Sequence, residues 1–299
     1  MLVDSHCHLD HSKMEVTPEE AVRRARLAGV ERIVTICTRL DRYELVREIA
    51  VQFDDVYMGV GVHPHEVGDA GIDRPDALID LAAADPKMVG VGETGLDYFY
   101  DFAPKAQQRT SFEAHILAAR HLALPLIIHT RDADDDTISI LREHWQDGAF
   151  PILIHCFTGG QALADAVVEM DGFISLSGIT TFKSAEDLRA VIDTVPNNRL
   201  LVETDAPYLA PTPHRGKTNE PAFVAHTADY WAVRKGMETE AFRAQTGQNF
   251  LTLFSKVPGE RTFTDNEQAN VPTSNRESHG SWLRIIGRRS ADYRRLGAL

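Results

Sequence analysis

Short runs of apolar residues alternate along the chain with longer stretches in which apolar positions recur at helical spacing. Eight of the short runs are rich in β-branched residues and apolar on both faces, which is typical of buried parallel strands. The strands we expect are Leu2–Ser5, Arg32–Cys37, Val56–Val62, Met88–Gly92, Leu124–His129, Pro151–His155, Gly172–Leu176 and Arg199–Glu203.

The stretches between these strands have the pattern of amphipathic helices, and several begin with an early proline, as at Pro18 and Pro104. The helices we expect are Pro18–Ala28, Arg42–Phe53, Arg74–Ala84, Pro104–His121, Asp134–Gln146, Gln161–Met170, Ser184–Val195, Pro221–Lys235 and Thr239–Phe254. The strict alternation predicts an α/β fold, a TIM-like (β/α)8 barrel in a single domain. A doubly wound open sheet is the alternative architecture.

The barrel accounts for most of the 299 residues. We expect residues 1–258 to form it, since this fold takes roughly 250 residues. Residues 259–299 are predicted to be a polar linker and an Arg-rich tail, without a packed core of their own. Within this segment residues 264–281 are polar, and residues 282–299 carry five arginines among a few apolar positions.

Composition narrows the class of protein. The net charge of −13 argues against broad DNA binding through a basic face, but not against a nucleic acid held locally by a metal and a few arginines. No apolar run approaches the roughly 20 residues that cross a bilayer, and the N-terminus lacks the pattern of a signal peptide. Three cysteines are too few for a disulfide framework. We therefore expect a cytoplasmic protein with no membrane partner.

Metal-ligating side chains interrupt the apolar runs where the predicted strands end. In a barrel the carboxyl ends of all strands meet at one face, where active sites are built. The side chains that converge there are His6, His8, Glu93, His129, His155 and Asp205. Four imidazoles and two carboxylates in one pocket predict a metal centre.

The spacing of these residues divides them into two groups. Residues two apart on a strand point the same way, so His6 and His8 can hold one cation, with Asp205 from the last strand completing its site. His129 and His155, on adjacent strands, can hold a second cation. Glu93 lies between and can bridge the two. The set suits two divalent ions such as Mg, Mn or Zn, and paired cations suit hydrolysis by an activated water.

Several further residues are candidates for the substrate side of the site. Arg131 shares the face of His129 and can take phosphate oxygens bidentately, or pair with Asp132 or Asp134 instead. His63 ends the third strand and can donate to a phosphate. Arg215 lies in the loop after the eighth strand, where it can hold a nucleic-acid backbone or remain solvated.

Two aromatic residues and two cysteines lie beside the predicted ligands. Tyr98 and Phe99, beyond Glu93, can stack a base, although packing of their own loop is the more economical interpretation. Alternation along the strand aims Cys7 away from its histidine neighbours, and we expect both Cys7 and Cys156 to pack behind the site.

The motifs together resemble the TatD family of metal-dependent hydrolases, within the amidohydrolase superfamily. The matching segments occur in the family's order and span most of residues 1–255. They are VDSHCHLD (3–10), GVHPH (61–65), GETGLDYFY (92–100), PLIIHTRDADDDT (125–137), ILIHCFTG (152–159), LLVETDAPYLAP (200–211) and PHRGKTNEPAFV (213–224).

The resemblance implies a TIM-like barrel and divalent-metal-dependent phosphodiester hydrolysis, described as deoxyribonuclease activity. It implies ligand roles for the same six positions that the strand ends single out, and this sequence departs from the family at none of them. Glu93 stands where many relatives in the superfamily use a modified lysine. Residues beyond about 258 lie outside the family pattern.

Our leading hypothesis is a 3′–5′ exodeoxyribonuclease with DNA as a transiently bound substrate. An activated water attacks a terminal phosphodiester, Asp205 accepts its proton as general base, and Arg131 offsets charge on the phosphoryl oxygens. One alternative is a hydrolase with the same site acting on an amide, lactone or aminoacyl ester. Another is a metal-binding accessory protein without turnover.

Overall fold

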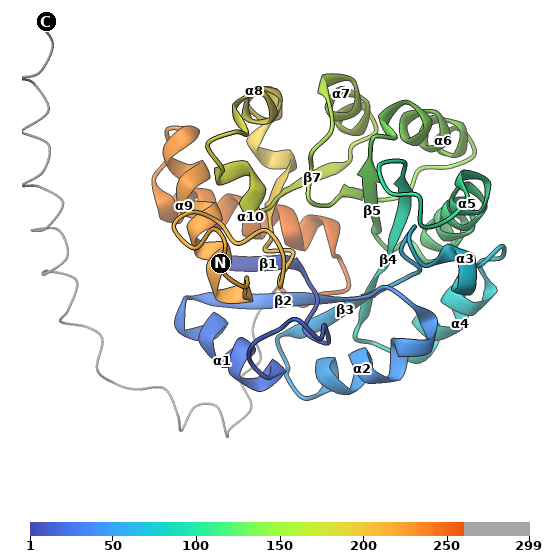
Figure 1. The fold of residues 1–299 in the computed structure, drawn as a ribbon, viewed down its shortest axis with the longest axis horizontal. Helices are drawn as coiled ribbons and strands as arrows, with labels where there is room; N and C mark the ends of the chain where they lie inside the picture. Colours follow the sequence, from blue (N-terminus) through green and yellow to red (C-terminus); the bar gives the residue numbers. More distant parts are fainter. Residues whose placement is uncertain (260–299) are drawn as a thin grey trace, which may run out of the picture. The chain divides into compact units, whose positions relative to one another are not determined.

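Eight parallel strands, each hydrogen-bonded to the next in chain order, form the centre of the fold (Figure 1). The computed structural model describes residues 1–259, which belong to one compact unit. The strands are β1 (Leu2–Cys7), β2 (Val30–Cys37), β3 (Val56–Val60), β4 (Met88–Asp97), β5 (Leu126–Arg131), β6 (Ile152–Ile154), β7 (Phe173–Leu176) and β8 (Leu200–Val202). All eight predicted strands are confirmed.

The first and last strands meet and close the sheet into a barrel. A parallel bridge joins Cys7 to Ala206, directly beyond the ends of β1 and β8. The backbone N–H of Asp205 donates to the carbonyl of His6 (2.9 Å), and that of His8 donates to the carbonyl of Ala206 (2.8 Å). The barrel is therefore confirmed, and the doubly wound open sheet is wrong.

Helices surround the barrel and cover one of its ends. They are α1 (Pro18–Leu27), α2 (Tyr43–Val51), α3 (Val67–Ala70), α4 (Asp76–Ala84), α5 (Lys105–Leu122), α6 (Asp134–Gln146), α7 (Gln161–Glu169), α8 (Glu186–Thr194), α9 (Val224–Arg234) and α10 (Thr239–Leu253). Short 3₁₀ turns occur at Leu40–Arg42, Gly178–Thr181, Asn197–Arg199 and Pro221–Phe223. The nine predicted helices are present, and only the single turn α3 was not expected.

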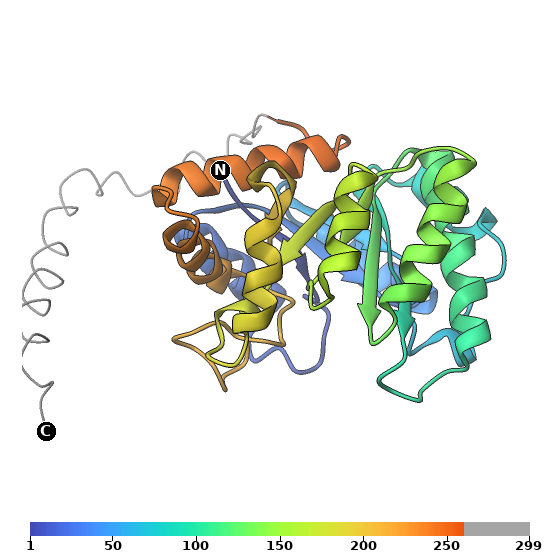
Figure 2. The same cartoon turned by 90° about the horizontal axis from the view of Figure 1, so that it is seen from above.

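The inside of the barrel is a packed core that is plugged from one end. Inward side chains of the strands, among them Val34, Ile127 and Leu153, form one buried cluster with Phe250 and Phe254. These two phenylalanines belong to or directly follow α10, which lies across the end of the barrel where the strands begin (Figure 2). The opposite end, where the strands finish, is left for the site.

Strand β4 is longer than the sequence predicts. We expected it to end at Gly92 with Glu93 just beyond, but it continues to Asp97 after a register shift against β5. Gly92 and Gly95 both have φ of +133°, a backbone conformation that favours glycine. A Cβ at either position would clash with a carbonyl oxygen of β5, that of Ile127 or His129. Glu93 therefore lies within the strand.

Two further expectations concern membrane-spanning helices and the C-terminal segment. No helix within residues 1–259 combines the length and apolarity that a membrane crossing requires. The predicted polar linker and Arg-rich tail, residues 259–299, lies outside the described residues except for Gly259.

Candidate metal centre

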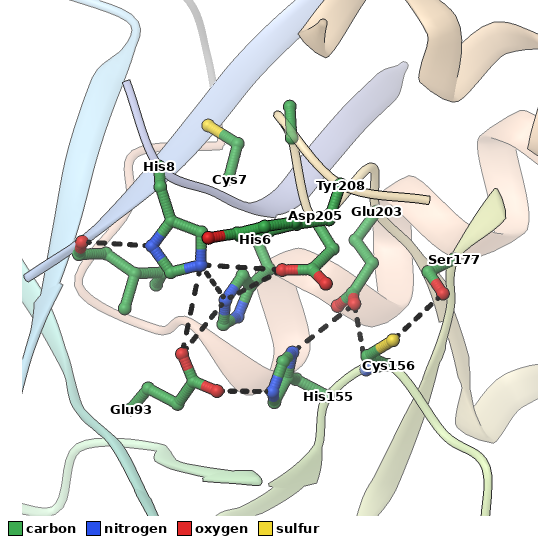
Figure 3. Close-up of polar contacts among 12 residues, drawn as sticks. His6, Cys7, His8, Glu93, His155, Cys156, Ser177, Glu203, Asp205 and Tyr208 are labelled. Atoms are coloured by element: carbon green, nitrogen blue, oxygen red, sulfur yellow. Dashed lines mark hydrogen bonds and ion pairs between the residues drawn. The ribbon is translucent and has the colours of Figure 1, made fainter. Parts of the chain in front are cut away.

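The six predicted ligands come together at the end of the barrel where the strands finish. Figure 3 shows His6, His8, Glu93, His155 and Asp205. Glu93, buried in β4, is at their centre, and its two carboxylate oxygens face different partners. Two groups of three donor atoms, each with its atoms within 4.8 Å of one another, share this carboxylate. They are His6–His8–Glu93 and Glu93–His129–His155. The geometry brings together the two groups predicted from spacing, and a further group, His6–His155–Glu203, joins residues of both.

The first group lies at the seam of the barrel, where Asp205 from beyond β8 joins His6 and His8. Glu93 Oε2 lies 3.5 Å from His6 Nε2 and 3.9 Å from His8 Nε2. Asp205 Oδ1 lies 3.8 Å and 3.4 Å from the same two nitrogens. The two Nε2 atoms are 3.3 Å apart, because strand alternation turns both rings to one side. Two imidazoles and two carboxylates thus surround one position.

The second group lies on the other oxygen of Glu93. Glu93 Oε1 is 2.7 Å from His155 Nε2, 3.2 Å from His129 Nδ1 and 3.4 Å from His63 Nε2. His129 comes from β5, and His155 directly follows β6, the neighbouring strand. A carboxylate with a separate donor set on each oxygen can bridge two cations.

Asp97 fixes the orientation of His129. Its Oδ2 lies 3.0 Å from His129 Nε2 and 2.8 Å from His65 Nε2, so both rings donate N–H groups to one oxygen. With the proton of His129 on Nε2, the lone pair of Nδ1 faces Glu93 and the second donor set. A carboxylate that holds the far side of a ligating imidazole is a recurrent feature of metal sites. Asp97 was not predicted as a site residue, because the sequence pattern placed the end of β4 five residues earlier.

The buried polar atoms around His155 indicate that the site is built to hold an additional group. Both ring nitrogens of His155 and Nδ1 of His6 are buried without a hydrogen-bond partner among residues 1–259. His155 Nε2 is close to Glu93 and Nδ1 is 3.4 Å from Glu203 Oε1, yet neither approach has hydrogen-bond geometry. Unpartnered buried nitrogens are costly, and a divalent cation beside Glu93 Oε1 would satisfy Nε2 of His155. The donor set fits such ions.

The pKa shifts differ among the ligands: burial lowers the pKa values of His8, His129 and His155, but neighbouring carboxylates outweigh it and raise them, whereas the pKa values of both carboxylates are lowered. Burial raises the pKa of Glu93, but the charges of His155 and His63 outweigh it and hold the pKa well below its usual range. Burial also raises the pKa of Asp205, and the hydrogen bond with His8 brings it below its ordinary value. Burial lowers the pKa of His6, which keeps that imidazole neutral. Anionic carboxylates and a neutral imidazole are the forms that bind cations.

Comparison with known proteins assigns the chain to a family. A family model described as "TatD related DNase" matches residues 3–255. The chain belongs to the TatD family. It is a metal-dependent hydrolase of that family, and its His and Glu clusters are able to bind metal.

The relatives of this TatD-family protein share nearly its whole barrel. The uncharacterized metal-dependent hydrolase YcfH of Escherichia coli (strain K12) is 42% identical over 258 residues, covering 85% of this chain and 95% of the relative. The 3′-5′ ssDNA/RNA exonuclease TatD of Klebsiella pneumoniae (strain 342) is 32% identical, with 85% and 97% covered. The crystal structure of YJJV, a TatD homolog from Escherichia coli, superposes with a TM-score of 0.79 at 28% identity, covering 86% and 98%.

A cavity of about 1060 Å³ opens over the metal-binding groups. Two of the predicted substrate residues, His63 and Arg131, line it. Arg131 forms no ion pair within residues 1–259, so the alternative pairing with Asp132 or Asp134 is not present in the described structure. Arg215 is outside the lining, with its guanidinium over the ring of Phe182 at 4.4 Å. Substrate contacts of all three residues remain predictions.

The aromatic residues after β4 are arranged differently from the expectation. The hydroxyl of Tyr98 donates to Asp136 (2.6 Å), and Tyr98 borders a separate, smaller pocket. Phe99 carries the guanidinium of Arg131 over its ring at 3.9 Å. Of the aromatic side chains after β4, Tyr100 and Phe102 line the metal-site cavity, and neither was predicted as a site residue.

The two cysteines near the site differ. Cys7 is buried with its thiol toward the carbonyl of Val34, and Figure 3 shows it pointing away from the histidines, as predicted. Cys156 lines the cavity, 3.1 Å from the Ser177 hydroxyl, so the expectation that it packs behind the site is wrong. Its backbone is left-handed, with φ of 42°, which breaks the strand alternation from which its direction was inferred.

The residues that line the cavity beside the first donor group were not predicted either. Lys13 and Arg42 line the cavity there, together with His11 and Tyr208. The Tyr208 hydroxyl is 2.8 Å from His11 Nε2, and Lys13 lies over the Tyr208 ring at 5.2 Å. Arg42 pairs with Asp10 at 2.8 Å. Only their position in the sequence indicated these residues. His11 and Lys13 follow the His-x-His pair, and Tyr208 follows Asp205, each within five residues.

Proposed function

We propose that the protein is a divalent-metal-dependent phosphodiesterase of nucleic acids, a 3′–5′ exodeoxyribonuclease that uses two cations. The observation that carries the proposal is the shared carboxylate of Glu93, with His6, His8 and Asp205 beside one oxygen and His129 and His155 beside the other. Divalent ions bound there supply a Lewis acid for the scissile group and lower the pKa of a water.

Asp205 is the residue we assign to the proton of the attacking water. Its carboxylate lies at the edge of the cavity, has 14% of its side chain exposed, and its pKa is held below the ordinary value despite burial. It is therefore ionised at neutral pH and able to accept a proton, as a general base must. The water adds to phosphorus, its proton passes to Asp205, and the departing 3′-oxygen takes a proton as it leaves. The product is a 5′-nucleotide.

The substrate is held by groups on the other side of the cavity. Arg131 is the cation nearest to His129 in sequence and has no carboxylate partner in the described chain, so its N–H groups are free to bind phosphoryl oxygens. His63, beside Glu93 Oε1, can donate to the same phosphate. The name of the Klebsiella pneumoniae relative, an exonuclease of single-stranded DNA and RNA, supports a nucleic-acid substrate. Zn, Mn and Mg all suit the mixed imidazole and carboxylate donors.

The test combines elemental analysis with a nuclease assay. Purified protein is analysed for bound metals, treated with a chelator, and assayed on single-stranded DNA labelled at its 5′ end. We expect stepwise shortening from the 3′ end, loss of activity on chelation and recovery with Mg, Mn or Zn. A parallel panel of an amide, a lactone and an aminoacyl ester is run with the same metals. If the protein hydrolyses only members of that panel and not DNA, it is a hydrolase of another bond and not a nuclease. No turnover of any substrate would favour a metal-binding accessory role.

A further inference from the structure

Three exposed aromatic side chains lie together on the loop between β4 and α5, and a fourth exposed one, Tyr208, lines the same cavity from the segment after β8. Phe99, Tyr100 and Phe102 are 54%, 40% and 64% exposed. Other large apolar residues that are exposed, such as Leu27 and Val233, lie on separate helices away from the cavity lining. A contiguous apolar cluster beside a polar site indicates a binding surface, whereas scattered exposed residues need no explanation.

Two of these rings pack against each other beside the cavity. Tyr100 and Phe102 are stacked, with centroids 5.2 Å apart and planes within 15° of parallel. The ring of His65 meets both edge-on, at 5.3 Å and 4.8 Å. Tyr100, Phe102 and His65 all line the cavity that contains the metal-binding groups. We call Tyr100 and Phe102 the aromatic platform.

The platform is held in place by the residue that orients the metal ligand His129. Asp97 Oδ1 accepts the backbone N–H groups of Phe99 (3.0 Å) and Tyr100 (2.9 Å), while its Oδ2 accepts from His129. Gln108 of α5 donates to the carbonyls of Asp97 and Ala103, at the two ends of the loop. These hydrogen bonds hold both ends of the loop, and a loop held in this way loses less entropy when a ligand binds.

A positive charge lies directly beside the platform. The guanidinium of Arg131 is 3.9 Å from the centre of the Phe99 ring and 5.1 Å from that of Tyr100. It has no acidic partner among residues 1–259, and it lines the same cavity. Flat apolar rings next to a fixed guanidinium match a ligand in which flat bases alternate with phosphates.

We propose that the aromatic platform stacks an unpaired nucleobase of the substrate strand, with Arg131 on the adjacent phosphate. The inference rests on the proposed nuclease function and names the residues that hold the base at that site. Bases inside a duplex present no free face for stacking, so a duplex must first expose a base to reach the platform.

The experiment measures binding separately from hydrolysis. Fluorescence anisotropy in excess chelator, where no turnover occurs, compares a labelled single-stranded 8-mer of deoxythymidylate with the same 8-mer lacking its last two bases. Phe102→Leu and Tyr100→Leu keep apolar bulk but remove the ring, and Phe102→Trp restores a ring. Val233→Ala, on the exposed side of α9 and outside the cavity lining, is the control. Stability is followed by thermal unfolding, so that a misfolded variant is recognised.

We expect the intact 8-mer to bind each leucine variant about 5- to 150-fold more weakly than the wild type, the range that stacking of one base implies. The abasic 8-mer should bind the wild type and the leucine variants alike, and Phe102→Trp should retain the preference for bases. Equal binding of both 8-mers by a wild type that still degrades DNA would overturn the platform and leave the nuclease intact. Base-dependent binding without any hydrolysis would support the platform and overturn the nuclease. Absence of binding to either 8-mer, together with absence of hydrolysis, would overturn both.

Discussion

At the scale of single residues, Asp97 connects the metal-binding groups with the loop beside them. One of its oxygens accepts from two histidine rings and the other accepts from two backbone N–H groups. Burial raises the pKa of this carboxyl, but the hydrogen bonds from His129 and from the Tyr100 backbone outweigh it, and the pKa lies below its usual range. The group is therefore a permanent acceptor at neutral pH.

Replacing Asp97 by Asn should weaken metal binding without removing a ligand. An amide nitrogen cannot accept the N–H of His129, so the ring loses the contact that directs Nδ1 toward Glu93. We expect a loss of roughly 10- to 100-fold in affinity for the second cation. Calorimetric titration of metal-free protein measures it, with the exposed Asp76→Asn as control. An Asp97→Asn protein that binds both cations like the wild type would show that the contact is not needed for orientation.

Asp205→Asn tests the proposed general base at the same scale. The amide keeps the size of the side chain and cannot take up a proton, so we expect kcat to fall by about 10²- to 10⁴-fold. Circular dichroism and metal analysis establish that the variant is folded and loaded. Normal DNA hydrolysis by such a protein would exclude Asp205 as the base.

At the scale of elements, β4 decides where Glu93 and Asp97 lie. Its backbone passes Gly92, where φ is positive, and pairing with β5 resumes at Thr94 and continues through Gly95, where φ is also positive. Because of this irregularity Glu93 turns toward the cavity, and Asp97 reaches the end of the strand beside His129.

Gly92→Ala should destabilise the barrel more than an equally left-handed glycine elsewhere. A methyl group at residue 92 would collide with the carbonyl oxygen of Ile127 in addition to straining the backbone, whereas at Gly29, with φ of +87°, it would meet nothing within 4 Å. We expect Gly29→Ala to cost about 1–2 kcal/mol from conformation alone, and Gly92→Ala to exceed it by at least ~1 kcal/mol. Urea denaturation measures both, and equal losses would contradict the close approach of β4 to β5.

The same irregularity marks the limit of sequence-based prediction for this chain. Strand ends carrying His6, His129 and His155 could be found because a polar residue after a buried apolar run is conspicuous. The extension of β4 could not, since a run containing Gly92 and Gly95 has weak strand propensity, and the pairing that sustains it comes from β5. The turn at Cys156 was missed for a related reason, because a left-handed residue is invisible to alternation.

Helix α5 carries a buried histidine whose protonation opposes folding. His115 accepts the backbone N–H of Val62 on Nε2 and donates from Nδ1 to the carbonyl of Ser111, so it must be neutral. Burial lowers its pKa to about 4. The unfolded chain, with an ordinary pKa near 6.5, binds more protons below that value, so stability is full above pH 6.5 and is lost as pH falls toward 4.

Comparison of the wild type with His115→Gln isolates this contribution from the histidines of the metal centre. The stability advantage of the wild type should shrink by about 2 kcal/mol between pH 7.5 and pH 5. Urea denaturation at the two pH values gives the difference in the free energy of unfolding. A constant difference between the two proteins would mean that His115 is not held neutral in the fold.

At the scale of the whole molecule, the ligands come from β1, β4, β5 and the ends of β6 and β8, so a bound cation contacts distant parts of the chain at once. Anything that binds only the folded state stabilises it by mass action. A metal at 100 times its dissociation constant adds about 2.7 kcal/mol to the free energy of unfolding.

Chelation should therefore lower the thermal midpoint of the intact protein. For a barrel of this size we expect a decrease of roughly 5–10 °C, fully reversed by returning the divalent ion. The decrease should be smaller in His6→Ala, in which the first donor group lacks a nitrogen. Differential scanning fluorimetry with matched ionic strength provides the measurement. If the protein is shown to contain metal and its thermal midpoint does not change on chelation, ligation from several strands would be contradicted.

The seam between β1 and β8 has a consequence for biosynthesis. The earliest donors emerge from the ribosome within the first eight residues, and Asp205 is made about two hundred residues later, next to the pairing that closes the barrel. A nascent chain that has not reached this point lacks the last carboxylate of the centre. The predicted metal centre therefore has its full set of donor side chains only after β8 has been made and the seam with β1 has formed.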